Sequence, residues 1–161
     1  VLFVNGSSVA RVYFREGEIF YAVLGEEHQL GPMKSLSRLA TWRAGAYRFE
    51  ENAELEEFML ELEDTTQQLV SLLLRESKEL AELSSRAPGP QTVLEVNRPL
   101  PGPLSQLEQM ELEVLQLAWD HGDVQTILDT SPASDLETTR AMLNLIRRGF
   151  LQRGGRSPTV T

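Results

Sequence analysis

The fold of the first half of this chain is decided by residues 9–24, which read VARVYFREGEIFYAVL. Two runs of β-branched and aromatic residues, 9–14 and 19–24, flank a short polar link at residues 15–18. Such runs favour β-strands, and Gly17 supplies the positive φ angle that a tight hairpin turn needs. The stretch therefore predicts an antiparallel hairpin.

The segments on either side of this hairpin predict a larger sheet and a helix. Residues 1–4 form another apolar run, and turn-forming residues follow it at 5–8, so we predict a three-stranded meander. Pro32 suits the first turn of a helix. We expect the apolar face of that helix to consist of Met33, Leu36, Leu39 and Ala40. We place the end of the helix at Gly45, just after Trp42 and Arg43. Tyr47 and Phe49 alternate with charged residues and predict a further strand.

Residues 51–83 combine an ambiguous segment with a clear helix. The Glu-rich composition of residues 51–63 favours a helix, but Phe58, Leu60 and Leu62 recur at period two, and we favour a strand. Residues 65–68 match a capping box and predict a helix that continues to about residue 83. Its apolar stripe either packs on its own sheet or forms the seam of a homodimer; it comprises Leu69, Leu72, Leu73, Leu80 and Leu83.

Proline and glycine residues organise the second half of the chain. We predict a Pro-rich linker over residues 88–104, which is extended and non-helical over 97–104. The apolar residues Val93, Leu94 and Val96 indicate a segment that packs against a partner, which favours a shared core of the two halves over two independent domains. Three helical patterns follow, around 110–118, around 124–128 and from Ser134 or Asp135 to about 146, where we expect no complete capping box. A glycine-centred hairpin after residue 149, with a turn at 153–156 and a short strand at 159–161, completes the outline of a winged helix.

These patterns together predict an α+β protein, with a small antiparallel sheet and helices followed by a three-helix, winged-helix-like unit. The boundaries we expect are 1–87 for the first domain, 88–104 for the linker and 105–161 for the winged-helix-like unit. Because the chain begins inside an apolar run, we expect its natural start to lie before Val1.

The order of elements in residues 1–83 resembles the PATAN domain, the PatA N-terminal module of bacterial signalling and polarity proteins. The resemblance rests on the hairpin at 12–22, the polar loop ending at 31, the helix running to Trp42, the Gly-aromatic-x-Phe strand at 45–49 and the leucine-rich run at 72–76. Two features depart from the family pattern: its opening helix is absent, and Glu16 replaces the more usual Asp. The resemblance implies a non-catalytic protein–protein interaction module, found beside receiver domains and in regulators of Ras-like GTPases.

Composition limits the chemistry that this chain can perform. The sequence has no cysteine, which excludes disulfides, thiolate catalysis and thiolate metal sites. Its apolar runs are too short to span a membrane, so we expect no membrane insertion and a cytoplasmic location. It contains no phosphate-binding glycine loop and no visible pair of nucleophile and base, so we expect neither an enzyme nor a cofactor.

The two histidines do not form a metal-binding pattern. His28 follows Glu26 and Glu27 in a loop, where a metal or acid–base role is the alternative to a solvated side chain. Neither histidine has a second ligand at helical spacing, so we predict no metal site. His121 precedes a glycine at a helix end, where a cation interacts favourably with the helix dipole.

Charge is distributed unevenly over the chain, whose net charge is −9. Residues 51–87 carry ten acidic and three basic side chains, a run that is either a solvated face or a docking site for a basic partner. A basic cluster follows on the third helix of the second half and in its hairpin. Its candidate nucleic-acid contacts are Arg140, Asn144, Arg147, Arg148, Arg153 and Arg156.

We therefore predict a signalling adaptor that binds a bacterial signalling or polarity protein, with a receiver domain or a Ras-like GTPase as the partners that the resemblance implies. The candidate contact surfaces are the outer side of the first three strands, the loop at 25–31 and the helix end near residue 42. The residues singled out there are Tyr13, Tyr21, His28, Trp42 and Arg43. The alternative is a DNA-binding transcription regulator, but we expect no nucleic-acid partner because an acidic chain repels a polyanion.

Overall fold

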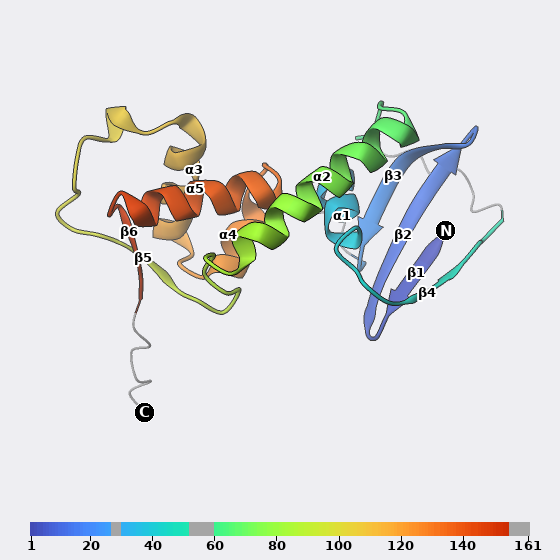
Figure 1. Ribbon diagram of the computed structural model, residues 1–161, viewed down its shortest axis with the longest axis horizontal. Coiled ribbons are helices and arrows are strands. Elements are labelled where there is room, and N and C mark those ends of the chain that lie inside the picture. Colours follow the sequence, from blue (N-terminus) through green and yellow to red (C-terminus); the bar gives the residue numbers. More distant parts are fainter. Residues whose placement is uncertain (27–29, 52–59, 155–161) are drawn as a thin grey trace. The chain divides into compact units, whose positions relative to one another are not determined.

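The computed structural model describes residues 1–26, 30–51 and 60–154 (Figure 1). In this part of the chain it shows an α+β protein with a four-stranded antiparallel sheet, a two-stranded sheet and five α-helices. The chain divides into two compact units, Val1–Lys78 and Glu79–Thr161. None of the described helices has the length and apolar character that a membrane crossing requires.

The sheet of the first unit contains the predicted meander. Strands β1 (Leu2–Asn5), β2 (Ser8–Arg15) and β3 (Glu18–Leu24) pair antiparallel in sequence order, and β4 (Ala46–Arg48) adds to the other side of β1. The β2–β3 turn places Gly17 at φ 85°, the left-handed conformation for which glycine was predicted.

Two helices cover one face of this sheet, α1 (Pro32–Leu39) and the first part of α2 (Thr66–Ser84). Figure 1 shows α1 lying against β3. The core between sheet and helices forms because apolar side chains of β2 and β3 meet the apolar stripes of the helices. The register of β2 against β3 shifts between Tyr13 and Phe14, and Ile19 and Ala22, three positions apart, both enter this core. It consists of Val12, Ile19, Ala22, Leu36, Leu69 and Leu73.

The start of α2 is fixed by hydrogen bonds to its own first turn and to β3. The predicted capping box is present: the Gln68 N–H donates to Thr65 Oγ1 at 3.3 Å, and the Thr65 N–H donates to Gln68 Oε1 at 3.0 Å. The Ile19 N–H donates to Thr66 Oγ1 at 2.9 Å, and the Thr66 N–H donates to the carboxylate of Glu18. Hydrogen bonds from Thr66 hold the pKa of Glu18 below its ordinary value.

Helix α1 is shorter than the sequence predicts. It ends at Leu39, so the prediction that Gly45 closes this helix is wrong. A Cβ atom at Gly45 would lie 2.7 Å from the carbonyl oxygen of Val4 in β1. Glycine is therefore required at this position because two backbone segments approach closely, not because a helix ends there.

The strand predicted over residues 51–63 lies mostly outside the described residues. At its described end, residues 60–63 form no strand, which corrects the prediction there. The Leu62 N–H nevertheless donates to the carbonyl oxygen of Phe20 at 2.8 Å, while the side chain of Leu60 is 66% exposed. The described end of this segment therefore forms a backbone hydrogen bond to β3 but does not pair with it as a strand.

The second unit contains a strand in the segment that the sequence predicts to be a linker. Strand β5 (Leu94–Val96) pairs antiparallel with β6 (Leu151–Arg153), and Val93 forms an isolated bridge with Asp123. Leu94 is only 1% exposed and belongs to the core. Residues 88–104 therefore contribute backbone pairing and core packing to this unit. Residues 97–103 are non-helical, as predicted, but the prediction is wrong at Leu104, which begins a 3₁₀ turn.

Three helices and a short 3₁₀ turn complete the second unit. The 3₁₀ turn is η2 (Leu104–Gln106), and the helices are α3 (Gln109–Asp120), α4 (Val124–Thr130) and α5 (Asp135–Arg147). The fully or almost fully buried residues that hold these elements together are Val114, Val124, Ile127, Met142, Leu145 and Leu151.

Helix α5 begins with a complete capping box, which corrects the expectation that none would form. The Glu137 N–H donates to Ser134 Oγ, and the Ser134 N–H donates to Glu137 Oε2, each at 3.2 Å. The third position of the helix, rather than the fourth, carries the required carboxylate. The turn predicted at residues 153–156 is wrong at Arg153, which is the last residue of strand β6 (Leu151–Arg153). Residues 155 and 156 of that turn and the strand predicted at 159–161 lie outside the described residues.

Candidate protein-binding site

The second unit carries an apolar groove of about 480 Å³, which we call the Trp119 groove. One wall is a face of α3, and the other is the segment that follows β5. Residues three, four and seven positions apart share a face of a helix, so α3 presents a continuous stripe to the groove. The lining residues are Val96, Arg98, Leu100, Leu104, Leu112, Leu115, Gln116 and Trp119.

Four large apolar side chains of this groove are exposed to solvent. The exposed fractions are 40% for Leu100, 43% for Leu104, 39% for Leu112 and 56% for Trp119. Apolar side chains gathered around one hollow, rather than scattered singly, mark surfaces that bind a partner. Tryptophan and arginine are also the side chains most enriched among the residues that dominate binding energy at interfaces.

Arg98 stacks on the exposed tryptophan of the groove. Its guanidinium carbon lies 4.0 Å from the centroid of the Trp119 ring. Among the described residues, Arg98 forms no hydrogen bond and no ion pair, and it is the one charged side chain that lines the groove. The Gln116 amide donates to the carboxylate of Asp120 at 3.0 Å. The groove thus contains one cation whose N–H donors remain available.

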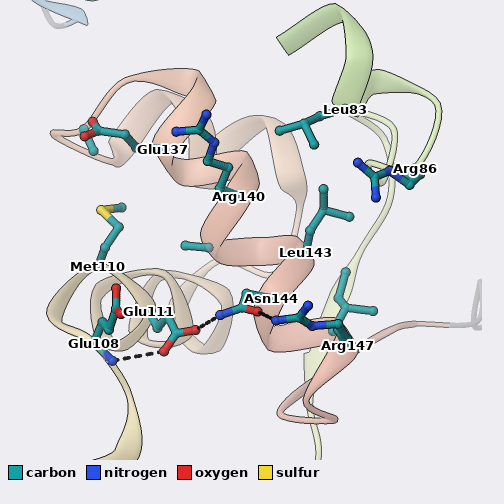
Figure 2. A pocket seen from close by; sticks show the side chains of 13 residues that line it. Leu83, Arg86, Glu108, Met110, Glu111, Glu137, Arg140, Leu143, Asn144 and Arg147 are labelled. Carbon is teal, nitrogen blue, oxygen red and sulfur yellow. Dashed lines mark hydrogen bonds between the residues drawn. The ribbon is translucent and has the colours of Figure 1, made fainter. Parts of the chain in front are cut away.

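A second groove, of about 770 Å³, lies beside α3 and α5, and we call it the α3–α5 groove (Figure 2). Three of the polar residues that line it, Glu111, Asn144 and Arg147, are connected by side-chain hydrogen bonds. Glu111 is 3% exposed and accepts hydrogen bonds from the Glu108 N–H at 3.0 Å and from the Asn144 side-chain amide. The guanidinium of Arg148 donates to the same carboxylate at 2.9 Å. These contacts tie α3 to α5.

The environment of Glu111 keeps its carboxyl group ionised. Burial by itself raises the pKa of this group. The hydrogen bonds from Glu108 and Asn144, together with the positive charge of Arg148, outweigh burial and hold the pKa of Glu111 below its ordinary value. The Glu111 carboxylate already accepts hydrogen bonds from three donors, on Glu108, Asn144 and Arg148. We therefore interpret the polar side of the α3–α5 groove as a structural clasp, which joins α3 to α5 and does not bind a ligand.

The candidate nucleic-acid contacts on α5 are engaged within the second unit. Arg140 forms an ion pair with Glu79, and Arg147 donates a hydrogen bond to the Asn144 side-chain oxygen. Asn144 uses its amide nitrogen on Glu111, so its donor is also occupied. Arg140, Asn144 and Arg147 therefore lie on one helix, as predicted, but their side chains bind other residues of the same unit.

The arginines after Asn144 show the same behaviour. Arg148 contacts Glu111, donates to the Gln106 carbonyl at 3.1 Å and lies 5.4 Å from the Phe150 ring centroid. Arg153 donates to the Arg86 carbonyl at 2.8 Å. Arg156 lies outside the described residues.

The candidate protein contacts of the first unit are only partly exposed. Tyr13 and Tyr21 lie together, with their ring centroids 6.0 Å apart, but Tyr21 is only 5% exposed, and burial raises its pKa. The expectation that the outer side of the first three strands is exposed is therefore wrong at β3, since Phe20 and Val23 are buried beside Tyr21. The ring of Tyr13 also lies 6.3 Å from that of Phe20, so these side chains form one aromatic cluster.

The remaining candidates differ in exposure. Trp42 is half-buried and Arg43 is exposed, and both follow α1 rather than forming its end. His28 lies outside the described residues. Within the described part of the chain, no three histidine, aspartate or glutamate side chains gather as metal ligands.

The sequence reasoning missed Arg98 and Trp119. A signal for the groove was nevertheless present, since Leu112, Leu115 and Trp119 recur at i, i+3 and i+7 and form a second apolar stripe beside the core stripe of the same helix. The stacking of Arg98 on Trp119 carried no such signal, because the two residues belong to different segments.

Comparisons with known proteins do not assign the chain to a family. No protein-family model matches it, and the comparisons with curated proteins and with solved structures give no match.

Proposed function

We propose that this protein is a non-catalytic adaptor of the cytoplasm that binds another protein through the Trp119 groove. The observation that supports this proposal is the concentration of four exposed large apolar side chains around one groove. Covering such side chains removes apolar surface from water, which is worth about 25 cal/mol per Å² before the costs of association. The resemblance of the first unit to PATAN domains supports the same class of function and favours a bacterial signalling or polarity protein as the partner.

We also propose that the second unit is winged-helix-like and is used for protein contact, not for DNA. The succession of α3, α4, α5 and β6, with β5 paired to β6, supports the winged-helix interpretation. The arginines that would meet phosphates are instead bound within the unit, as Arg140 is to Glu79 and Arg148 is to Glu111. Phosphate binding would require these intramolecular contacts to be exchanged, in a chain whose net charge is already −9.

The first test concerns DNA. We expect no gel shift of a double-stranded DNA fragment at protein concentrations of about 10 μM in physiological salt, because non-specific affinity depends on free cationic side chains. A shift that disappears in Arg147→Ala and Arg153→Ala, with a log–log salt slope several units negative, would promote the DNA-binding regulator over the adaptor. Both arginines are exposed, so these variants leave the core intact.

The second test concerns the protein partner. Affinity capture from a lysate of the native host, followed by mass spectrometry, is expected to recover at least one protein several-fold less with Trp119→Ser than with the unaltered chain. Leu74→Ser is the matched control, because Leu74 is 66% exposed but lies on α2, outside the groove. Equal recovery with all three baits would contradict a role for the groove.

A further inference from the structure

We propose that the segment bound in the Trp119 groove is an amphipathic helix that carries one acidic side chain, which pairs with Arg98. This inference rests on the proposed function, because it assumes that the groove binds a protein. It adds the conformation and the charge of the bound segment.

The helical form of the partner follows from the dimensions of the groove. Its α3 wall runs from Leu112 to Trp119, which is about two helical turns, or about 10 Å. The opposite wall presents Leu100 and Leu104, so apolar side chains flank the hollow along both sides. A helix laid into such a groove presents apolar side chains at i, i+3 or i+4 and i+7, which matches the length of the wall.

The acidic side chain of the partner follows from the state of Arg98. The Arg98 guanidinium carbon lies over the Trp119 ring, 4.0 Å from its centroid, so the ring covers one side of the guanidinium. A guanidinium presents its N–H donors in its own plane, where a carboxylate can reach them. No described residue accepts these hydrogen bonds. A guanidinium held in one orientation binds a carboxylate through two parallel hydrogen bonds, and partner binding would strengthen them by excluding water.

Other occupants of the groove fit these observations less well. A basic helix would place its cations beside Arg98, the one charge that lines the groove among the described residues. A fatty acid would supply a carboxylate, but small-molecule sites bury most of their ligand. The groove instead leaves Leu104 43% and Trp119 56% exposed, which suits a partner that covers a surface.

The experiment selects displayed helical peptides that bind the 161-residue chain. The peptides are about four turns long, with leucine at i, i+3 and i+7 and all other positions randomised. The selected peptides are expected to share an aspartate or glutamate at a constant position relative to the leucines. The affinity of a synthetic peptide of that sequence should fall about tenfold with Arg98→Gln and hardly change with Arg75→Gln, which alters an exposed arginine of the first unit. Arg98→Glu should bind the peptide in which lysine replaces the acidic residue.

The outcomes separate this inference from the proposed function. Peptides that require Trp119 but bind Arg98→Gln as tightly as the unaltered chain would overturn the acidic helix and leave the protein-binding groove standing. Selected peptides that bind Trp119→Ser unchanged would overturn both. Dodecanoate that binds in an Arg98-dependent manner, with no peptide selected, would replace the helix by a small acyl ligand. Circular dichroism of each variant establishes that it is folded.

Discussion

Replacing Leu94 with alanine is expected to lower the free energy of unfolding of the second unit by about 3 kcal/mol. Leu94 is 1% exposed and packs in the same core cluster as Val114, Leu145 and Leu151. Removing its isobutyl group would leave a cavity, because β5 is held between β6 and the bridge at Asp123 and cannot move inward. The result measures whether residues 88–104 belong to the core or serve only as a linker.

Each unit contains one of the two tryptophans, so the fluorescence of each tryptophan reports on the unfolding of its own unit. In a Trp42→Phe background, the fluorescence of Trp119 during urea titration reports on the second unit. Val93→Ala is the control, because Val93 adjoins Leu94 but is 47% exposed, and its expected effect is below about 0.5 kcal/mol. Equal effects of the two substitutions would show that this segment is a linker without core contacts.

Replacing Glu111 with alanine is expected to destabilise the second unit by about 2 kcal/mol. Glu111 is almost completely buried, and its removal leaves the Asn144 amide, the Glu108 N–H and Arg148 without their shared acceptor. The side chain of Arg148 is 30% exposed and stays partly hydrated, which keeps the loss below that of a fully buried ion pair. The same Trp119 fluorescence assay measures the loss.

The pH dependence of this effect has a definite sign. The folded state lowers the pKa of Glu111 below the ordinary value of 4.5, so ionised Glu111 stabilises the fold fully at pH values above 4.5. This contribution decreases as the pH falls below 4.5 and through the lowered pKa of the folded state. The difference in unfolding free energy between the unaltered chain and Glu111→Gln should therefore be constant near neutral pH and shrink in acid.

Glu113→Gln serves as the matched control for Glu111. Glu113 lies on the same helix and accepts a hydrogen bond from the Gln109 side chain in an exposed position. Its replacement is expected to change the stability by less than about 0.5 kcal/mol. A Glu111→Gln effect that grows in acid, or that equals the effect of Glu113→Gln, would contradict the interpretation of Glu111 as the clasp between α3 and α5.

Features that depend on neighbouring residues in the chain were predictable from the sequence. The β-branched and aromatic runs in residues 9–24 and the glycine at 17 predicted the β2–β3 hairpin, because strand preference and turn conformation are local properties. The cap formed by Thr65 and Gln68 was predictable for the same reason, since both members lie in one helical turn. The capping glutamate of α5 was equally local: Ser134 was one of the two predicted caps, and Glu137 occupies the third helical position after it, but the prediction of no complete box overlooked this pair.

Features that join distant segments were decided by the tertiary structure. Gly45 is required by the backbone of β1, and Tyr21 is buried in an aromatic cluster, although neither contact is visible as a periodic pattern. Leu94 became a core residue because β6, far along the chain, pairs with its strand. Val93, Leu94 and Val96 lie between Pro90 and Pro99, and their sequence is compatible both with a linker and with a buried strand. Only the pairing with β6 distinguishes the two.

The candidate site divides in the same way. The sequence by itself determined that α3 carries apolar residues at 112, 115 and 119, so that a second stripe lay beside the core stripe. Only the tertiary structure decided that Arg98 stacks on Trp119 while the α5 arginines bind Glu79 and Glu111. The sequence shows that a side chain is cationic, but the fold determines which group it contacts. An ion pair or a ring contact depends on distances in space that the order of the residues does not specify.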